Sequence, residues 1–411
     1  MNIEGWTRKS LGSFTQFIKG ITYASEDYCK EDEGAIFLTI KCVSKSGGFK
    51  LEGIKYYRGI IHENEKLKEG DILISNTDLT RDGDIVGCPI MVPFLGTNEV
   101  TMSMDLSKLV IDSFQIDSKF LYYKLMTDKV RRFMQDHASG STVLHLQTKA
   151  VPTLELLIPD KKEEQEKIAE ILSTIDRAIA QTEAIIAKQQ RIKTGLMQDL
   201  LTKGIDENGN IRSEATHKFK DSAIGRIPVE WEVETIGKIA SLQRGHDIRE
   251  VEFIAGDYPV IASSGVIGFH NIKTSDSPNV VVGRKGSIGN VYYLDVDFWA
   301  HDTSLYVTNF FGNNQKYIYY LFLYLELERF GTKSGSPSLN RNDIHPLKIS
   351  LPKPMEQERI SKMLSHFDTS ISNLKSGLNK LQHQKNGLMQ DLLTGKVRVT
   401  NLLKEKELTI P

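Results

Sequence analysis

The eight residues GLMQDLLT stand at positions 195–202 and recur, letter for letter, at 387–394. With the resulting offset of 192 positions, residues 164–202 align with 356–394 without a gap, and 19 of these 39 positions are identical. The period is far longer than the 20–50 residues of a solenoid repeat. The chain is therefore interpreted as a duplicated half-protein.

Apolar residues in both copies are spaced as in a coiled-coil helix, in two series of positions seven apart that form a seam. In the second copy the series are Ile360, Phe367, Leu374, Leu381, Leu388 and Leu364, Ile371, Leu378, Leu392. In the first copy they are Ile168, Ile175, Leu196 and Leu172, Ile179, Leu200. Two such helices most simply bury their seams against each other, and about 39 residues of helix measure roughly 60 Å.

A lysine interrupts the apolar seam at the same point of each copy. Lys193 and Lys385 occupy equivalent positions in the helical pattern. A polar residue there can fix the register of a helix pair at a cost in stability. The alternative is that each ammonium group only reaches solvent past a frayed edge. The sequence leaves both interpretations open.

Outside the helices, a weaker repeat and a β-rich pattern define two globular parts. The stretch from Trp6 to Gly12 matches the stretch that begins at Trp231, and Gly20 then matches Gly245. Short β-branched and aromatic runs broken by Gly, Asn and Asp indicate strands and turns. The predicted fold class is therefore α+β. The predicted boundaries are 1–158 and 231–351 for the globular parts, 159–204 and 352–400 for the helical regions, 205–230 for a linker and 401–411 for a tail.

Composition and charge limit the functional classes. The 411 residues are 40% hydrophobic and 26% charged, as in a globular protein of two or three domains. No window is apolar enough for a membrane span, and three cysteines without a CxxC pair favour a reducing cytoplasm over a disulfide framework. Because the net charge is −1, nucleic-acid binding would depend on local basic patches or on partner subunits.

The sequence shows no catalytic motif. The P-loop, HExxH and GxSxG patterns are missing, as are the Asn-Pro-Pro-Tyr and Asp-Pro-Pro-Tyr motifs of adenine methyltransferases. The glycine-rich run from Gly283 to Gly289 lies between two strand-like stretches, whereas a P-loop joins a strand to a helix. It is either a glycine turn or a loop that presents basic side chains to DNA. We predict no catalytic residue, no metal site and no cofactor.

These features together resemble the specificity subunits of type I restriction–modification systems, and the resemblance covers nearly the whole chain. The helical signature of that family stands here as IPDKKEEQEKIAEILSTID with GLMQDLLTKG, and as LPKPMEQERISKMLSHFD with GLMQDLLTGK. The stretch IGRIPVEWEVETIG at 224–237 is similar to the family's entry into a second recognition domain. The resemblance implies two target-recognition domains separated by two long helices, which pack as an antiparallel coiled coil with a pseudo-twofold internal repeat.

The resemblance also implies a function and partners. Such a chain would be a non-catalytic reader of double-stranded DNA, in which each globular domain binds one half of a bipartite, asymmetric target. Two methyltransferase subunits would dock on the helical region and modify adenines with S-adenosylmethionine. An endonuclease–translocase subunit would join them for cleavage. The helices would set the spacer between the half-sites.

Candidate DNA contacts are polar or basic residues in predicted loops, because these residue types bind base edges and phosphates. In the first globular part they are Lys41, Ser44, Lys45, Asn76, Thr77 and Arg81, and in the second they are Ser263, Ser264, Arg284, Lys285 and Ser287. The alternative for each is a solvated turn residue. Arg131 and Arg132, which follow an apolar helical stretch, are interpreted as an ordinary charged face.

Three other functions remain open from the sequence. One is the recognition subunit of a related bifunctional restriction enzyme. Another is a coiled-coil scaffold without a DNA role, although two unlike globular domains argue against it. The third is a tandem-domain enzyme, which would need a polar catalytic cluster that the sequence does not show.

Overall fold

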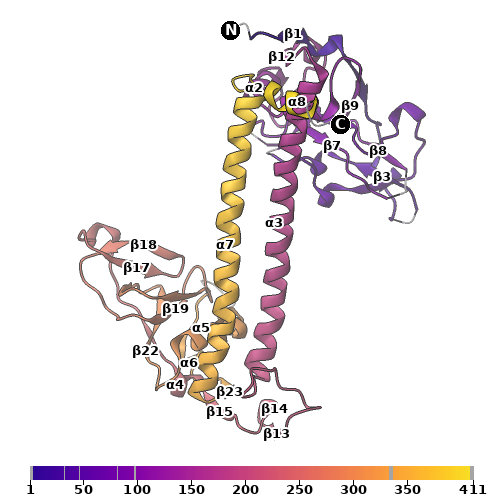
Figure 1. Cartoon of the computed structure of the whole chain (residues 1–411). Coiled ribbons are helices and arrows are strands. Elements are labelled where there is room, and N and C mark those ends of the chain that lie inside the picture. The colour runs from indigo at the N-terminus through magenta and orange to yellow at the C-terminus, as the bar shows by residue number, and fades with distance from the viewer. Residues whose placement is uncertain are drawn as a thin grey trace. The chain divides into compact units, whose positions relative to one another are not determined.

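The computed structural model describes residues 3–31, 33–45, 47–80, 82–96, 99–332 and 337–407. The chain divides into two compact units. Unit 1 comprises residues 1–181 and 378–411, and unit 2 comprises residues 182–377. The chain has two long helices, α3 (Lys162–Thr202) and α7 (Pro354–Leu392) (Figure 1). Each of them belongs partly to unit 1 and partly to unit 2.

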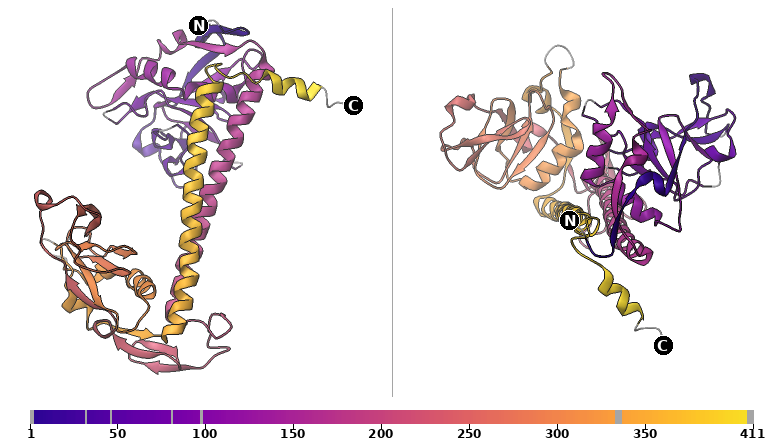
Figure 2. Two further views of the ribbon diagram at one scale, coloured as in Figure 1. Left: turned by 60° about the vertical axis from the view of Figure 1, so that its left-hand side comes forward. Right: turned by 90° about the horizontal axis from the view of Figure 1, so that it is seen from above.

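Unit 1 contains two main sheets. The larger is antiparallel with the order β2-β9-β5-β7, and the smaller has the order β4-β3-β8 with β3 parallel to β8. Their strands are β2 (Thr15–Lys19), β9 (Leu106–Ile111), β5 (Ile72–Ser75), β7 (Pro89–Met91), β4 (Lys55–Tyr57), β3 (Ala35–Leu38) and β8 (Val100–Met102). The other strands and short helices of this unit are β1 (Trp6–Ser10), β12 (Glu155–Pro159), β6 (Thr77–Asp78), β10 (Ala138–Ser139), β11 (Leu144–Leu146), α1 (Ser118–Leu125), α2 (Asp128–Asp136) and α8 (Thr400–Glu407). Helix α8 turns away from the axis of α7 (Figure 2).

The two main sheets of unit 2 have the same strand order as those of unit 1. Its antiparallel sheet has the order β16-β22-β19-β20, and its smaller sheet has the order β18-β17-β21 with β17 parallel to β21. Their strands are β16 (Ser241–Arg244), β22 (Ser304–Asn309), β19 (Asn279–Gly283), β20 (Val291–Leu294), β18 (Gly265–His270), β17 (Tyr258–Ala262) and β21 (Trp299–Ala300). The remaining elements are β15 (Glu232–Thr235), β23 (Lys348–Leu351), α4 (Ile236–Ile239), α5 (Gln315–Leu325) and α6 (Arg341–Ile344). The hairpin of β13 (Phe219–Ser222) and β14 (Gly225–Pro228) lies within the segment predicted as a linker.

One inner strand of each larger sheet, β5 in unit 1 and β19 in unit 2, is buried on both faces. In β5, Ile72 and Ile74 pack in the core that contains α1, whereas Leu73 packs in the core that contains β3. Residues 280–282 of β19 alternate in the same way between the core that contains α5 and a second cluster around Phe298. Burial on both faces explains why these strands read as continuous apolar runs instead of alternating with polar residues.

The helix that follows each larger sheet is capped in the same way. The side chain of Asp117 accepts a backbone N–H of the first turn of α1, and Asn314 does so at the start of α5. The next contact is repeated as well. The amide oxygen of Gln165 accepts the backbone N–H of Asp117 at 2.8 Å, and Gln357 accepts that of Asn314 at 2.9 Å. Two identical glutamines of the repeat therefore attach each long helix to its globular part.

Buried carboxylates at the starts of the two long helices bind the segments that follow the opposite helices. Glu164 of α3 accepts hydrogen bonds from Arg398, beyond the end of α7, at 2.6 and 2.8 Å within unit 1. Glu356 of α7 accepts from Arg212, beyond the end of α3, at 2.5 and 3.2 Å within unit 2. The indole of Trp231 also donates to Glu356, at 3.1 Å. Each buried charge is thus paired, as burial of an ion requires.

The apolar seam of the helices is covered. All fifteen seam residues predicted from the heptads are buried or half-buried. The lysines that interrupt the seam are paired: Lys193 binds Asp368 at 2.5 Å in unit 2, and Lys385 binds Asp176 at 2.7 Å in unit 1. Of the two interpretations of these lysines, the structure therefore shows specific partners and not frayed edges.

Candidate nucleic-acid interface

Two loops meet at the same end of the larger sheet in each unit. In unit 2 they are the turn between β17 and β18 and the loop between β19 and β20. The carbonyl of Ser263 in the turn accepts hydrogen bonds from Tyr292 at 2.9 Å and from Asn290 at 3.4 Å. In unit 1 they are the connection from β3 to β4 and the loop from β5 to β7, which are joined by the ion pair of Lys45 with Asp84 at 2.7 Å. The candidate residues that the structure describes lie on or beside these loops.

The first loop of unit 1 carries three candidates. Lys41 lies in a short 3-10 helix, Ile40–Cys42, and is exposed. Ser44 is half-buried, and its backbone N–H bonds the carbonyl of Gly48 at 3.0 Å in a turn. Lys45 is exposed, and its ammonium group lies against the neighbouring loop. All three therefore lie in the connection between β3 and β4.

In the second loop of unit 1, the side chains of the described candidates form hydrogen bonds within the protein. Asn76 is buried: its amide nitrogen donates to the carbonyl of Met104 at 3.0 Å, and its amide oxygen accepts from Ser107 at 3.0 Å. The hydroxyl of Thr77 donates to Asp105 at 3.0 Å. These placements give both residues a structural role inside the protein. Arg81 lies outside the described residues.

A buried carboxylate and an arginine hold the rest of that loop in shape. Asp78 accepts the backbone N–H groups of Thr80, Ile85 and Val86; burial opposes its ionisation, but these hydrogen bonds outweigh burial and lower its pKa. Arg131 donates to the carbonyls of Val86 and Asp84, at 2.6 and 3.1 Å. The interpretation of Arg131 as part of an ordinary charged face is therefore wrong. Its guanidinium donates hydrogen bonds to backbone carbonyls of a loop about 45 positions away.

The loop between β19 and β20 in unit 2 presents basic groups. Arg284 is half-buried, and one of its guanidinium nitrogens donates to the carbonyl of Asp302 at 3.1 Å. Burial, with a contribution from the nearby charge of Arg244, lowers the pKa of Arg284. Lys285 and Ser287 are exposed on the same loop. The loop turns tightly at Gly286 and Gly289, both at φ +77°, so it is a glycine turn that also carries basic side chains outward.

The other candidates of unit 2 lie beside this loop. Ser263 is buried, and its backbone N–H bonds the hydroxyl of Thr303 at 3.3 Å, whereas Ser264 is exposed. The backbone shows which candidates are equivalent in the two units. The N–H of Arg284 bonds the carbonyl of Thr303, and the N–H of Asn76 bonds that of Asp105, directly after the corresponding strands. Asn76 and Arg284 therefore occupy the same position of the fold.

Sequence reasoning missed one basic residue at this sheet end. Arg244, the last residue of β16, is exposed, and its guanidinium binds the carboxylate of Asp302 at 2.8 Å. The repeat marks the glycine that follows it, because Gly245 matches Gly20, but it does not mark Arg244 itself as a functional residue. The position of Arg244 beside Asp302 depends on the fold.

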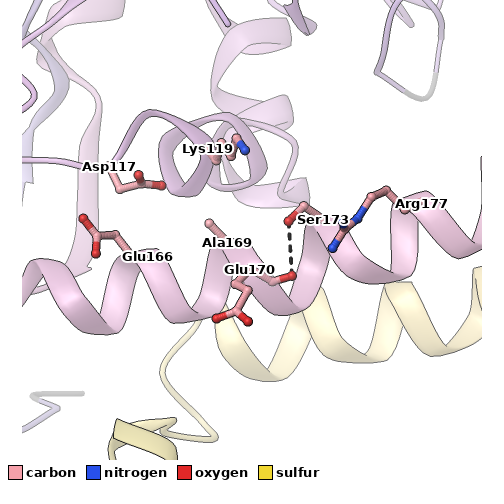
Figure 3. A pocket seen from close by; sticks show the side chains of 7 residues that line it. All are labelled: Asp117, Lys119, Glu166, Ala169, Glu170, Ser173 and Arg177. Carbon is pink, nitrogen blue, oxygen red and sulfur yellow. Dashed lines mark hydrogen bonds between the residues drawn. The ribbon is translucent and has the colours of Figure 1, made fainter. Parts of the chain in front are cut away.

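A separate cavity of about 470 Å³ lies in unit 1 between the start of α1 and one face of α3 (Figure 3). Its lining residues are Asp117, Lys119, Glu166, Ala169, Glu170, Ser173 and Arg177. The hydroxyl of Ser173 donates to the carbonyl of Glu170 at 3.1 Å. Because the lining mixes carboxylates with basic groups, it offers no preference for a polyanion such as DNA.

Two further features bear on the chemistry of the chain. Within the described residues, no group of three or more His, Cys, Asp or Glu side chains could hold a metal ion. No helix in this part of the chain is long and apolar enough to cross a membrane.

The sequence matches a family of known proteins and resembles several of its members. The family model of the type I restriction modification DNA specificity domain matches residues 3–190 and 228–383. The chain is 25% identical over 435 residues to the type I restriction enzyme MjaVIII specificity subunit of Methanocaldococcus jannaschii, covering 97% of this chain and 94% of that protein. It is 24% identical over 173 residues to the EcoprrI specificity subunit of Escherichia coli, covering 40% of this chain and 43% of that one.

Solved structures share the fold. The S subunit of a type I restriction–modification system from M. genitalium aligns with a TM-score of 0.62 and 18% identity, over 94% of this chain and 96% of that chain. A chain from a structural study of complex assembly and conformational transition in the type I R-M system aligns with a TM-score of 0.54 and 13% identity, over 95% and 98% of the two chains. With two matched specificity domains that together span most of its length, the chain belongs to the type I restriction–modification DNA specificity family, whose members bind DNA in a non-catalytic role.

Proposed function

We propose that this chain reads a bipartite, asymmetric DNA target for a type I restriction–modification complex, with one recognition domain in residues 1–158 and the other in 231–351. The observation that carries the proposal is the contrast between strands and loops. Both units have one strand order, yet the loops at the equivalent sheet ends differ: Asn76 in unit 1 stands where unit 2 has Arg284. One scaffold with two different reading surfaces suits a target with two different halves.

The helical regions, 159–204 and 352–400, are proposed to set the spacer between the half-sites as an antiparallel coiled coil. In each unit, rising residue numbers on α3 meet falling numbers on α7. Within unit 1, Glu164 pairs with Arg398 and Asp176 with Lys385. Within unit 2, Lys193 pairs with Asp368, and Glu356 accepts the backbone N–H of Ile205. The two Lys–Asp pairs are related by the same offset of 192, which supports a pseudo-twofold repeat.

Two methyltransferase subunits are proposed to dock on equivalent faces of the two helices, with an endonuclease–translocase subunit joining them. Support comes from exposed positions that are identical in the two copies. Gly195 and Gly387 lie inside the helices, are exposed, and have open space where a side chain would point. An exposed glycine inside a helix costs about 0.5–1 kcal/mol relative to alanine. Its presence in both copies is explained if the same partner approaches each helix backbone closely.

The test is to express the chain with the methyltransferase subunits of its own system and to map methylated bases across a genome. The expected result is adenine methylation at a bipartite motif with two different half-sites, and none when this chain is left out. The purified chain alone should transfer no methyl group. Methylation without sequence preference, or methyl transfer by the isolated chain, would refute the proposal.

A further inference from the structure

The end of β16 approaches the connection between β21 and β22 unusually closely. A Cβ atom on Gly245 would lie 2.1 Å from the carbonyl oxygen of His301, so only glycine fits there. This close approach holds the preceding residue, Arg244, beside Asp302. The register of the sheet agrees, because Arg244 pairs with Leu305 of β22, and Gly283 of β19 pairs with Ser304.

Asp302 links two guanidinium groups from different elements. Its carboxylate, with the side chain 18% exposed, accepts from Arg244 at 2.8 Å. Its main-chain carbonyl accepts from Arg284 at 3.1 Å. The second carboxylate oxygen lies 3.3 Å from the ring of His301, whose other ring nitrogen contacts the carbonyl of Ile248 at 3.2 Å. Asp302 is thus held in place and in turn fixes both arginines.

The cluster of Arg244, Arg284 and Asp302 carries more positive charge than its one carboxylate neutralises. The bond to Asp302 engages one nitrogen of Arg244, whose side chain is 55% exposed, while a guanidinium has five N–H donors. Donors therefore remain for an external acceptor. A rigid, planar fork of this kind matches the O6 and N7 acceptors of guanine in the major groove.

Unit 1 has no such cluster at the equivalent positions. The strand-end glycine there is Gly20, whose backbone N–H bonds Leu106 as that of Gly245 bonds Ser304. It follows Lys19, and the position of Asp302 is taken by Met104. Asn76, which stands in place of Arg284, is buried. The paired arginines therefore distinguish the reading surface of unit 2 from that of unit 1.

We propose that Arg244 reads a guanine in the half-site bound by unit 2, beside Arg284, and that Asp302 is the residue that positions it. This inference rests on the proposed function and adds the base class and the residue that recognises it. It predicts that at least one position of that half-site is guanine. It also predicts that replacing Arg244 relaxes specificity at that position alone.

The experiment uses the full complex with its methyltransferase subunits and duplexes that carry its methylated motif. Each guanine of the unit 2 half-site is replaced in turn by 7-deazaguanine, which lacks the N7 acceptor. The wild-type complex should bind one such duplex about tenfold more weakly, because 7-deazaguanine keeps O6 and removes one of the two hydrogen bonds of the bidentate contact. The variant Arg244→Ala, which removes both hydrogen bonds, should lose at least this factor on the natural duplex and show no further loss on the modified one.

Two more variants separate reading from charge and from folding. Arg244→Lys keeps the charge but not the fork, so it should retain binding to unspecific DNA and lose discrimination at that guanine. Asp302→Asn should lower discrimination while Arg244 is still present. Arg249→Ala, an exposed arginine of the same unit that is paired with Glu252 at 2.8 Å, is the matched control and should change neither property.

The outcomes are distinct. Arg244→Ala could instead weaken binding to all sequences equally and reduce the slope of log K against log salt concentration by about one. In that case the residue contacts a phosphate and the guanine assignment is wrong. If binding does not change, Arg244 serves only the internal ion pair. The half-site of unit 1 is an internal control, because its methylated sequence should persist in every variant. A wild-type complex without any sequence preference would instead refute the proposed function itself.

Discussion

Lys193 donates a hydrogen bond to Asp368 at 2.5 Å, and the same carboxylate accepts the hydroxyl of Tyr320 at 2.6 Å. The offset of 192 carries this arrangement onto Lys385 and Asp176, where the distance is 2.7 Å and Tyr123 donates at 2.7 Å. A lysine in an apolar seam is thus given a partner from the facing helix. Polar contacts of this kind favour one register over alternatives.

We expect Lys193 and Asp368 to be energetically coupled. A double-mutant cycle with Lys193→Met and Asp368→Ala, followed by chemical denaturation, should give a coupling free energy of about 1 kcal/mol, because both groups are partly withdrawn from water. The matched control is the pair Lys362 and Glu358, which is 2.6 Å apart but lies along the exposed face of one helix. That pair should give less than about 0.5 kcal/mol. Equal coupling free energies in the two cycles would contradict a role of Lys193 and Asp368 in fixing the register of the helices.

The two recognition domains should act independently. Exchanging residues 231–350 for the equivalent domain of a relative should change one half of the methylated motif and leave the other half as it was. The reason is that each unit has its own core, so that its loops are supported within the same unit. Genome-wide mapping of methylated bases gives the answer. A change in both halves would argue against modular reading.

Helix length should control the spacer of the motif. Inserting four residues near Ala187, an exposed position of α3, adds roughly 6 Å of helix. The insertion rotates the seam as a stutter instead of breaking it. The spacer should therefore lengthen by about one or two base pairs, at about 3.4 Å each, while both half-site sequences stay the same. An active variant with the original spacer would show that the helices are not the ruler.

Gly195 should be a contact point for a methyltransferase subunit. Gly195→Ala should raise the stability of the isolated chain by about 0.5–1 kcal/mol, since helix propensity improves and nothing lies within 4 Å of the new methyl group. Gly195→Leu should weaken assembly with the methyltransferase subunit, measured by analytical ultracentrifugation. Ala187→Leu, at another exposed position of the same helix, is the control and should leave assembly intact. Unaltered assembly with both leucine variants would place the docking surface elsewhere.

Lys124 should make the stability of unit 1 depend on alkaline pH. Its buried ammonium group donates to the carbonyl of Leu393 at 2.5 Å, and burial lowers the pKa of Lys124 to about 8. The unfolded chain therefore binds more protons than the folded chain between about pH 8 and the ordinary lysine pKa of about 10.4. The free energy of unfolding should rise with pH through this window by up to about 3 kcal/mol from this group.

The matched variant for that prediction is Lys124→Met. Its unfolding free energy, subtracted from that of the wild type at each pH, isolates the contribution of Lys124 from other groups that titrate nearby. Unit 2 has Leu321 at the equivalent place, seven residues after the helix cap. Because leucine does not titrate, this position of unit 2 contributes no pH dependence. A difference between wild type and Lys124→Met that does not vary between pH 8 and pH 10.5 would contradict the lowered pKa.

The sequence by itself determined the repeat, the seam and the class of the two globular parts. These features depend on short-range order: a heptad fixes which face of a helix is apolar, and an apolar run between glycines indicates a buried strand. The glycine loop at Gly283 was also placed correctly between two strands. The residues that carry these signals lie within a few turns of one another along the chain.

Only the tertiary structure decided which polar residues are used inside the protein and which face outward. Asn76 and Arg284 look alike as loop candidates, but the amide of Asn76 is consumed by groups 28 and 31 positions away. Arg131 supports a loop 45 positions away, and Arg244 meets Asp302 across 58 positions. Whether a polar side chain forms hydrogen bonds with such a distant partner depends on which loops the sheet brings together. Local pattern carries no information about that pairing.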